Sequence, residues 1–104
     1  MTTRVDSLTL AQSFAECSGL FFALAEVPRQ QILMLLSEAQ YLNVGQIAEL
    51  LPLSRPAISH HLKILRQAGL VATEKSGTAS LYRLSLGPGV ATLKGFLRQM
   101  ELCV

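Results

Sequence analysis

The first third of the chain carries two segments whose apolar residues recur at helical spacing. From Ser7 to about Ala25 the apolar side chains return at steps of three and four residues, which gives a helix with one apolar stripe. The stripe consists of Leu10, Phe14, Cys17, Phe21 and Leu24. A second helix is predicted to begin at Pro28, because proline is tolerated in a first helical turn, and to run through Leu36.

The next segment predicts a short helix after the polar stretch SEAQYLN. Asn43 is followed three residues later by Gln46, which resembles a capping box, in which each residue satisfies a backbone N–H at the start of a helix. We therefore expect a third helix from Val44 to about Leu51. The sequence Leu-Pro-Leu then ends it.

A fourth helix is predicted directly after this turn. Ser54 is a strong N-cap candidate, and Arg55 and Pro56 would occupy the first turn. The helix should run to about Ala68, where Gly69 supplies the C-terminal stop. Two short helices joined by a three-residue turn form a helix-turn-helix pattern.

The last third of the chain predicts a β-hairpin and a terminal helix. Two short strand-like runs, 71–75 and 79–85, are separated by Ser76-Gly77-Thr78. We interpret Gly87-Pro88-Gly89 as a break between the hairpin and a fifth helix, which covers about 88–103. Its apolar face carries Leu93, Phe96, Leu97, Met100 and Cys103.

Taken together, these elements predict a mainly α fold with one small β-hairpin, placed between the fourth and fifth of five helices. This order is that of a winged helix-turn-helix, and residues 1–104 make a single domain of this type. An α-helix fits the DNA major groove, and a basic hairpin beside it can reach along the phosphate backbone. The pattern therefore points to DNA as the partner.

The composition favours association with a second subunit. Half of the 104 residues are apolar and only 15% are charged, which is a low charge content for a small monomer. No run of about 18 apolar residues exists, so we expect no membrane span, and the N-terminus has no secretion signal. Two cysteines are too few for a disulfide framework. We therefore expect a cytoplasmic protein without a cofactor.

The charge is distributed unevenly along the chain. Residues 1–50 hold two basic and five acidic side chains, whereas residues 51–104 hold seven basic and two acidic ones. Such asymmetry suggests that the second half meets a polyanion. The alternative for basic residues such as Lys63 and Arg66 is a solvated helix face without any ligand.

A helical wheel separates the two adjacent histidines of the fourth helix. Its apolar arc contains Ala57, Ile58, Leu62, Ile64 and Leu65. His61 lies inside this arc, so we interpret it as a hydrogen-bonded packing residue. His60 lies on the opposite arc together with the polar and basic side chains.

The stretch VGQIAELLPLSRPAISHHLKILRQAGLV, followed by SLYRLS and preceded by ALAEVPRQQIL, resembles the ArsR/SmtB family of bacterial winged-helix repressors. One departure is AEVPR, where the family usually has its proline one residue earlier. The resemblance implies a homodimer that pairs its terminal helices, about 7–25 and 88–103, and binds double-stranded DNA at an inverted-repeat, palindromic operator. It implies DNA contacts from the fourth helix and the wing, at Ser54, Arg55, Ser59, His60, Lys63, Lys75, Ser76, Thr78 and Arg83.

Many members of this family are metal sensors, but the metal-ligand positions of the family are not filled here. The CxC motif of the thiolate site corresponds to Asn43 and Gly45, and residues 86–104 contain neither His nor Asp. The two histidines, being adjacent, cannot form a metal pair at i, i+4. We therefore expect no metal site built on histidine.

Cys17 and Cys103 are the remaining candidates for sensing. The resemblance places them on the paired terminal helices, where oxidation or reaction with a small thiol-reactive inducer would change the packing between subunits. The thiol sensors of the family have their second cysteine at the position of Met34, so this chain departs from them. There are three alternatives. The same thiols could bind arsenite or another soft metal, the cysteines could be packing residues without a sensing role, or the repressor could have no inducer.

Two other classes of protein compete with a DNA-binding repressor. An enzyme would need a nucleophile beside a histidine and an acid, and neither cysteine lies on a polar face, so we do not expect one. The other class is a winged helix that binds proteins. The clustering of basic charge on the fourth helix, hairpin and last helix favours DNA.

Overall fold

The structure, a computed structural model, describes residues 7–103. Its elements are α1 (Ser7–Leu24), α2 (Val27–Glu38), α3 (Val44–Leu50), α4 (Arg55–Gln67), β1 (Val71–Ser76), β2 (Ala79–Leu84) and α5 (Gly87–Leu102). Five helices with one antiparallel hairpin before the last helix confirm the predicted winged helix-turn-helix fold. The single domain was predicted over residues 1–104, of which 1–6 and 104 lie outside the described range.

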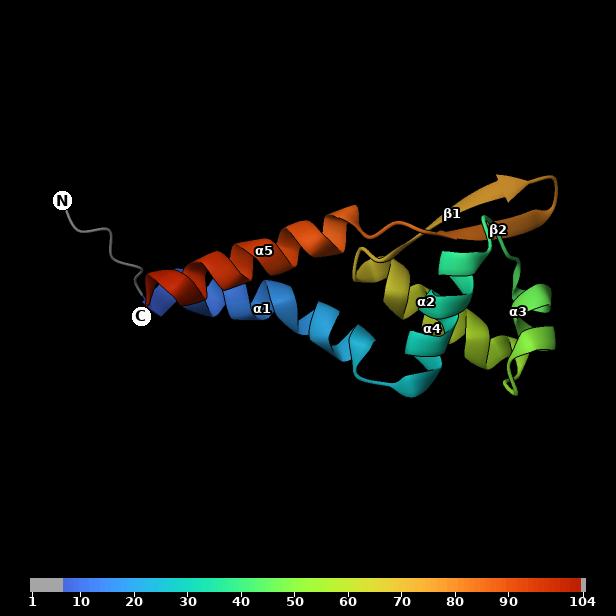
Figure 1. The fold of residues 1–104 in the computed structure, drawn as a ribbon, viewed down its shortest axis with the longest axis horizontal. Helices are drawn as coiled ribbons and strands as arrows, with labels where there is room; N and C mark the ends of the chain where they lie inside the picture. The colour runs from blue at the N-terminus through green and yellow to red at the C-terminus, as the bar shows by residue number, and fades with distance from the viewer. Residues whose placement is uncertain (1–6, 104) are drawn as a thin grey trace.

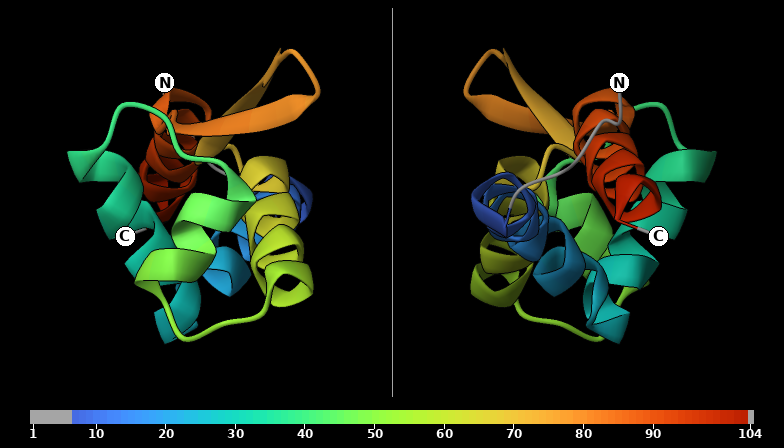
Figure 2. Two further views of the ribbon diagram at one scale, coloured as in Figure 1. Left: turned by 90° about the vertical axis from the view of Figure 1, so that its right-hand side faces the viewer. Right: turned by 90° about the vertical axis from the view of Figure 1, so that its left-hand side faces the viewer.

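The first and last helices lie side by side in opposite directions and extend away from the other elements (Figure 1). Phe96 of α5 joins them, because its ring meets the edges or faces of Phe14 and Phe21 at centroid distances of 5.2 and 5.5 Å. We call α1 and α5 the terminal helix pair. The hairpin projects from one side of the remaining helices (Figure 2).

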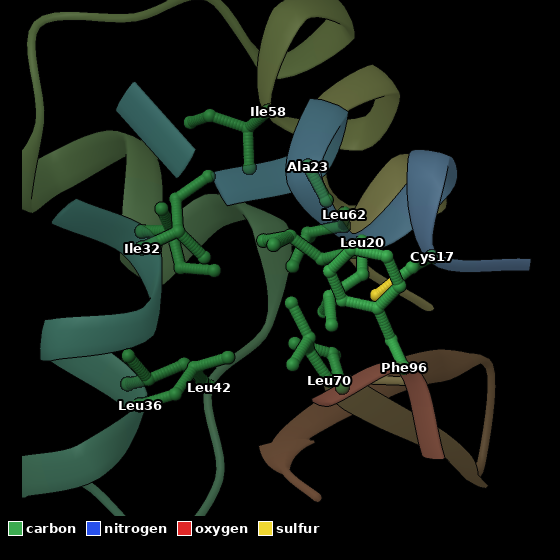
Figure 3. Packing of buried hydrophobic residues seen from close by; sticks show 13 residues of the cluster. Cys17, Leu20, Ala23, Ile32, Leu36, Leu42, Ile58, Leu62, Leu70 and Phe96 are labelled. Carbon is green, nitrogen blue, oxygen red and sulfur yellow. The ribbon is translucent and has the colours of Figure 1, made fainter. Parts of the chain in front are cut away.

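The hydrophobic core lies where α1, α2 and α4 meet and continues beneath the hairpin (Figure 3). α4 contributes Ile58, Leu62 and Leu65, which have no exposed surface. Burying a side chain of this size contributes about 1.5–3 kcal/mol, so one stripe of α4 is a major part of the core. The opposite stripe of the same helix remains in solvent.

The helix starts follow the capping signals in the sequence. The backbone N–H of Gln46 donates to the Asn43 side chain at 2.8 Å, and the Asn43 N–H donates to the Gln46 side chain at 2.8 Å. This reciprocal pair confirms the predicted capping box of α3. Pro28 lies in the first turn of α2, as predicted, although that helix begins one residue earlier, at Val27.

The C-terminal end of α4 packs directly on the start of α5. Gly69 has φ of 75°, and the N–H of Leu70 donates to the carbonyl of Leu65 at 3.0 Å, as in a Schellman motif. The N–H of Gly89 then donates to the Gly69 carbonyl at 2.8 Å. Gly87-Pro88-Gly89 is therefore the first turn of α5, and its interpretation as a break before the helix was wrong. Glycine is required for the close approach of the two backbones.

A short bridge ties the hairpin to the helical body. Leu42, in the loop between α2 and α3, pairs with Tyr82 of β2 through two backbone hydrogen bonds of 3.0 and 2.8 Å. The sequence analysis did not predict this contact. It fixes the base of the hairpin relative to α3 and α4.

Within residues 7–103, no single helix combines the length and apolarity needed to cross a membrane. α1 and α2 pass this test only as a pair, and they are bent by 82° relative to one another.

The two glycines with positive φ allow a matched test of the α4–α5 contact. Gly69→Ala should lower the free energy of unfolding by roughly 2–4 kcal/mol, because a Cβ there would lie 2.9 Å from both Gly89 N and Pro88 Cβ. Gly77→Ala, at φ 63° with nothing within 4 Å, should cost only about 1–2 kcal/mol. Urea denaturation measures both values. Equal losses would contradict the close packing at Gly69.

Candidate nucleic-acid interface

The solvent side of α4 is polar and basic. Ser54 begins the helix, because its hydroxyl accepts a hydrogen bond from the N–H of Ala57 at 3.2 Å. Six polar side chains of α4 are exposed, namely Arg55, Ser59, His60, Lys63, Arg66 and Gln67. This confirms the division of faces predicted from the wheel. We call Arg55, Ser59, His60 and Lys63 the reading face.

Arg55 lies where α3, α4 and the hairpin converge. Its guanidinium rests beside Gly45, whose missing side chain would come within 3.1 Å of Arg55 Nη2. The same region forms a polar groove of about 450 Å³ that also contains Asn43, Glu49 and Ser80. Arg55 therefore joins the reading face to the tip of the hairpin.

The hairpin places its predicted DNA contacts on two different faces. Lys75 pairs with Ser80 across the strands, and its Nζ donates to the Ser80 hydroxyl at 3.1 Å. Arg83 pairs with Ala72. Because side chains alternate along a strand, Arg83 points to the face opposite Lys75. Ser76 and Thr78 are exposed next to the turn at Gly77.

Arg83 lies at the base of the hairpin among acidic groups rather than at its tip. A groove of about 650 Å³ is lined there by Arg83, Glu38, Glu74 and Tyr41. A hydrogen bond to Glu74, its negative charge and burial raise the pKa of Tyr41, whereas the charge of Arg83 acts in the opposite direction. By the same alternation Ser76 lies on the face of Arg83, so the hairpin places Lys75 on one face and Ser76 with Arg83 on the other, Ser76 at the tip and Arg83 at the base. Contact of these residues with DNA stays a prediction.

One buried arginine was missed by the sequence analysis. Arg29, in the first turn of α2, is 1% exposed and makes a 2.6 Å ion pair with Glu26. Its Nε donates to the Ala23 carbonyl at 2.8 Å, and its Nη2 donates to the Phe22 carbonyl at 2.8 Å. The guanidinium also lies over the Phe22 ring, 4.8 Å from its centroid. Arg29 therefore satisfies the open carbonyls at the end of α1.

The other partner of Arg29 is His61, whose Nδ1 lies 3.1 Å from Arg29 Nη1. His61 is half-buried on the core side of α4, whereas His60 is exposed. This hydrogen bond confirms that His61 is a packing residue with a polar partner. Burial lowers the pKa of His61, as do the charges of Arg29 and His60, while Glu26 opposes them.

The two cysteines differ in accessibility. Cys17 is buried against the Phe96 side of the terminal helix pair, and burial raises the pKa of its thiol. Cys103 is exposed at the end of α5. Because Phe96 lies opposite Cys17 and Cys103 follows seven residues later, the two thiols are about 10 Å apart along the helix axis. A disulfide between them within one chain would require the helices to shift.

Among the residues that the structure describes, no group of three His, Cys, Asp or Glu side chains is placed to hold a metal ion. Asn43 and Gly45, the positions that match the thiolate motif of metal sensors, belong to the capped start of α3.

Comparison with known proteins matches the middle of the chain to one family. A model described as "Bacterial regulatory protein, arsR family" matches residues 28–73, from the first turn of α2 into β1. The HTH-type transcriptional regulator Rv2034 of Mycobacterium tuberculosis is 43% identical over 72 residues, which make up 69% of this chain and 65% of that protein. Transcriptional repressor SdpR of Bacillus subtilis is 37% identical over 68 residues, 65% of this chain and 74% of SdpR.

The fold is also similar to that of solved regulators. An ArsR-like transcriptional regulator from Rhodococcus sp. RHA1 matches with a TM-score of 0.72 at 34% identity, covering 88% of this chain and 79% of that one. The chain thus spans slightly less than two thirds of the mycobacterial protein and more of the other two. The family match contains the reading face and Arg29, whereas both helices of the terminal pair lie outside it.

Proposed function

Because the chain belongs to the arsR family of bacterial regulatory proteins, we propose that it is a DNA-binding repressor that acts as a homodimer on an inverted-repeat operator. The operator and the dimer are expectations of this proposal. As a member of a family of transcriptional regulators, the protein is not an enzyme.

The observation that carries the proposal is the reading face on α4. It begins at a capped helix end, where free backbone N–H groups favour a phosphate. Arg55 and Lys63 can reach guanine edges or phosphates, and Ser59 and His60 can hydrogen-bond to either. The hairpin would contact the phosphate backbone of the DNA next to the major groove through Lys75, Ser76 and Thr78. The buried stripe of α4 holds this side outward.

The terminal helix pair supports the dimer. Phe14, Phe21 and Leu97 keep 47%, 45% and 49% of their surface exposed, and Phe22, Met100 and Leu102 add to the same pair of helices. Exposed apolar residues at this density mark an interaction surface. A second copy that covers them through a two-fold axis would present two α4 helices, and a two-fold protein matches an inverted repeat.

Two Lys→Ala variants test DNA binding with the same change in net charge. Lys63→Ala should weaken binding to a duplex selected from a randomised pool and reduce the slope of log K against log salt by about 2, because each of the two subunits loses one phosphate contact. Lys94→Ala, on α5, should retain the wild-type slope. Fluorescence anisotropy across a salt series measures both, and melting curves check that both variants are folded.

The same titration discriminates a protein-binding winged helix from a DNA-binding one. No binding to any selected duplex at low salt, or binding that does not weaken with salt, would contradict the proposed function. If Lys63→Ala lowered the melting temperature as strongly as it weakened DNA binding, Lys63 would be a packing residue and not a DNA contact.

We also propose that thiol modification releases the DNA and that Cys103 is the reacting group. Its exposure at the end of α5 supports this, because an adduct or an intersubunit disulfide there alters the helix that covers the partner. Cys17 would react only after the terminal helix pair opens. Arsenite bound by thiols from both subunits is the competing inducer, and a repressor without an inducer is the third possibility.

Cys103→Ser should abolish release by oxidant or polysulfide while leaving basal DNA binding intact, because the exposed thiol is removed. Cys17→Ala is the matched control and should keep the response despite a small loss of stability. Intact-mass analysis beside duplex binding, with oxidant, polysulfide or arsenite, identifies the modified residue. Normal release of Cys103→Ser would eliminate Cys103 as the switch.

A further inference from the structure

A single hydrogen bond links the buried corner of the protein to the helix that carries the reading face. Arg29 Nη1 lies 3.1 Å from His61 Nδ1, and the two residues are 32 positions apart in the chain. A guanidinium can only donate hydrogen bonds, so Nδ1 of His61 must be the acceptor. The single proton of this neutral imidazole therefore resides on Nε2.

The donor in this bond is fixed from several sides. Arg29 is held by the carbonyls of Ala23 and Phe22 and by the carboxylate of Glu26, and it is almost completely buried. These contacts tie the guanidinium to the last turn of α1 and the start of α2. Through Arg29, His61 is therefore attached to the junction of α1 and α2.

The acceptor lies next to residues of the reading face. His60 directly precedes His61, with the two ring centroids 5.7 Å apart, and Lys63 follows two positions later; both are exposed. Because a helix is stiff over two turns, a shift of α4 at His61 moves these side chains by a similar amount. A change at this hydrogen bond would therefore be passed on to the exposed side of α4.

We propose that the Arg29–His61 hydrogen bond positions α4 for DNA binding and that protonation of His61 releases it. The inference rests on the proposed DNA-binding function and names a regulation of that same face. A protonated Nδ1 would be a donor facing a donor, with two positive charges about 3 Å apart. α4 would then lose its hydrogen bond to Arg29 and be held by its apolar stripe alone.

The groups around His61 set the direction of the pH dependence. Arg29 of α2 and His60 of α4 disfavour the protonated form, and Glu26, the residue before α2, favours it. Since the pKa of His61 in the folded protein is lowered, the contact is fully present above the unfolded value of about 6.5. It is lost as the pH falls from there through the folded value. DNA affinity should follow the same direction.

His60 and His61 are the only histidines, so a histidine-free background is available. We compare the full-length His60→Gln protein with the His60→Gln/His61→Gln protein on a duplex selected by the wild type. Glutamine can accept from Arg29 through its side-chain oxygen and does not titrate. The dissociation constant is measured from pH 8.0 to 5.0 at a temperature where melting curves show both proteins folded.

The Kd of His60→Gln should stay constant at alkaline pH and rise at least about threefold, relative to the double variant, by pH 5.0. Parallel profiles for the two proteins would overturn the inference while leaving the proposed function intact. A purely structural role would lower the melting temperature at acid pH without separating the Kd profiles. If neither variant nor the wild-type protein bound the duplex at any pH, the proposed function would be overturned and this inference with it.

The hydrogen bond is also tested without DNA. Imidazole ¹⁵N spectra of free His60→Gln should show His61 neutral at pH 7, with the proton on Nε2, and Arg29→Lys should shift its Nδ1 resonance. A proton on Nδ1 at pH 7 would overturn the inference.

Discussion

The arrangement of the helices depends on one buried guanidinium. Arg29 bonds to two carbonyls at the end of α1, to a carboxylate before α2 and to an imidazole on α4. A buried charge of this kind is tolerated only when its donors are satisfied, and leaving one buried donor without its partner costs about 1–3 kcal/mol, or more for a charged group. The end of α1, the start of α2 and the middle of α4 therefore meet at this corner. The core residues then pack around a geometry that this group specifies.

This constraint explains why two adjacent histidines have different environments. α4 directs Ile58, Leu62 and Leu65 into the core, and His61 meets Arg29 at the edge of the same stripe. His60, one position earlier, is rotated by about 100° and faces solvent. The polar face proposed to bind DNA is thus held by a polar contact on its other side.

Features set by neighbours in the chain could be predicted from the sequence. The capping box at Asn43, the stop at Gly69 and the two faces of α4 depend on spacing alone, and all three agree with the structure. Contacts between distant segments could not be predicted. The burial of Arg29 could not be predicted, because two of its partners are backbone carbonyls of another helix, and a backbone carbonyl leaves no mark in the amino-acid sequence. One signal for this contact was present in the sequence. A histidine in an apolar arc needs a hydrogen-bond partner, and Arg29 is one of only two basic residues in the first half of the chain.

The hairpin shows the same limit. The alternation of side chains separates Lys75 from Arg83 once the register is known, but the bridge from Leu42 to Tyr82 depends on a loop that the pattern leaves undefined. The Gly-Pro-Gly segment was misjudged because both glycines and the proline are typical of breaks. Its helical turn is possible because the backbones of α4 and α5 touch there.

Hydroxyl-radical footprinting on a selected duplex tests the central claim most directly, because it shows how many segments of the DNA backbone the protein covers and how far apart they lie. Two symmetric protected segments on one face of the DNA, centred about 10 base pairs or a multiple of this apart, are the predicted result for a two-fold dimer that reads with α4. A single protected segment, or uniform protection without symmetry, would contradict it.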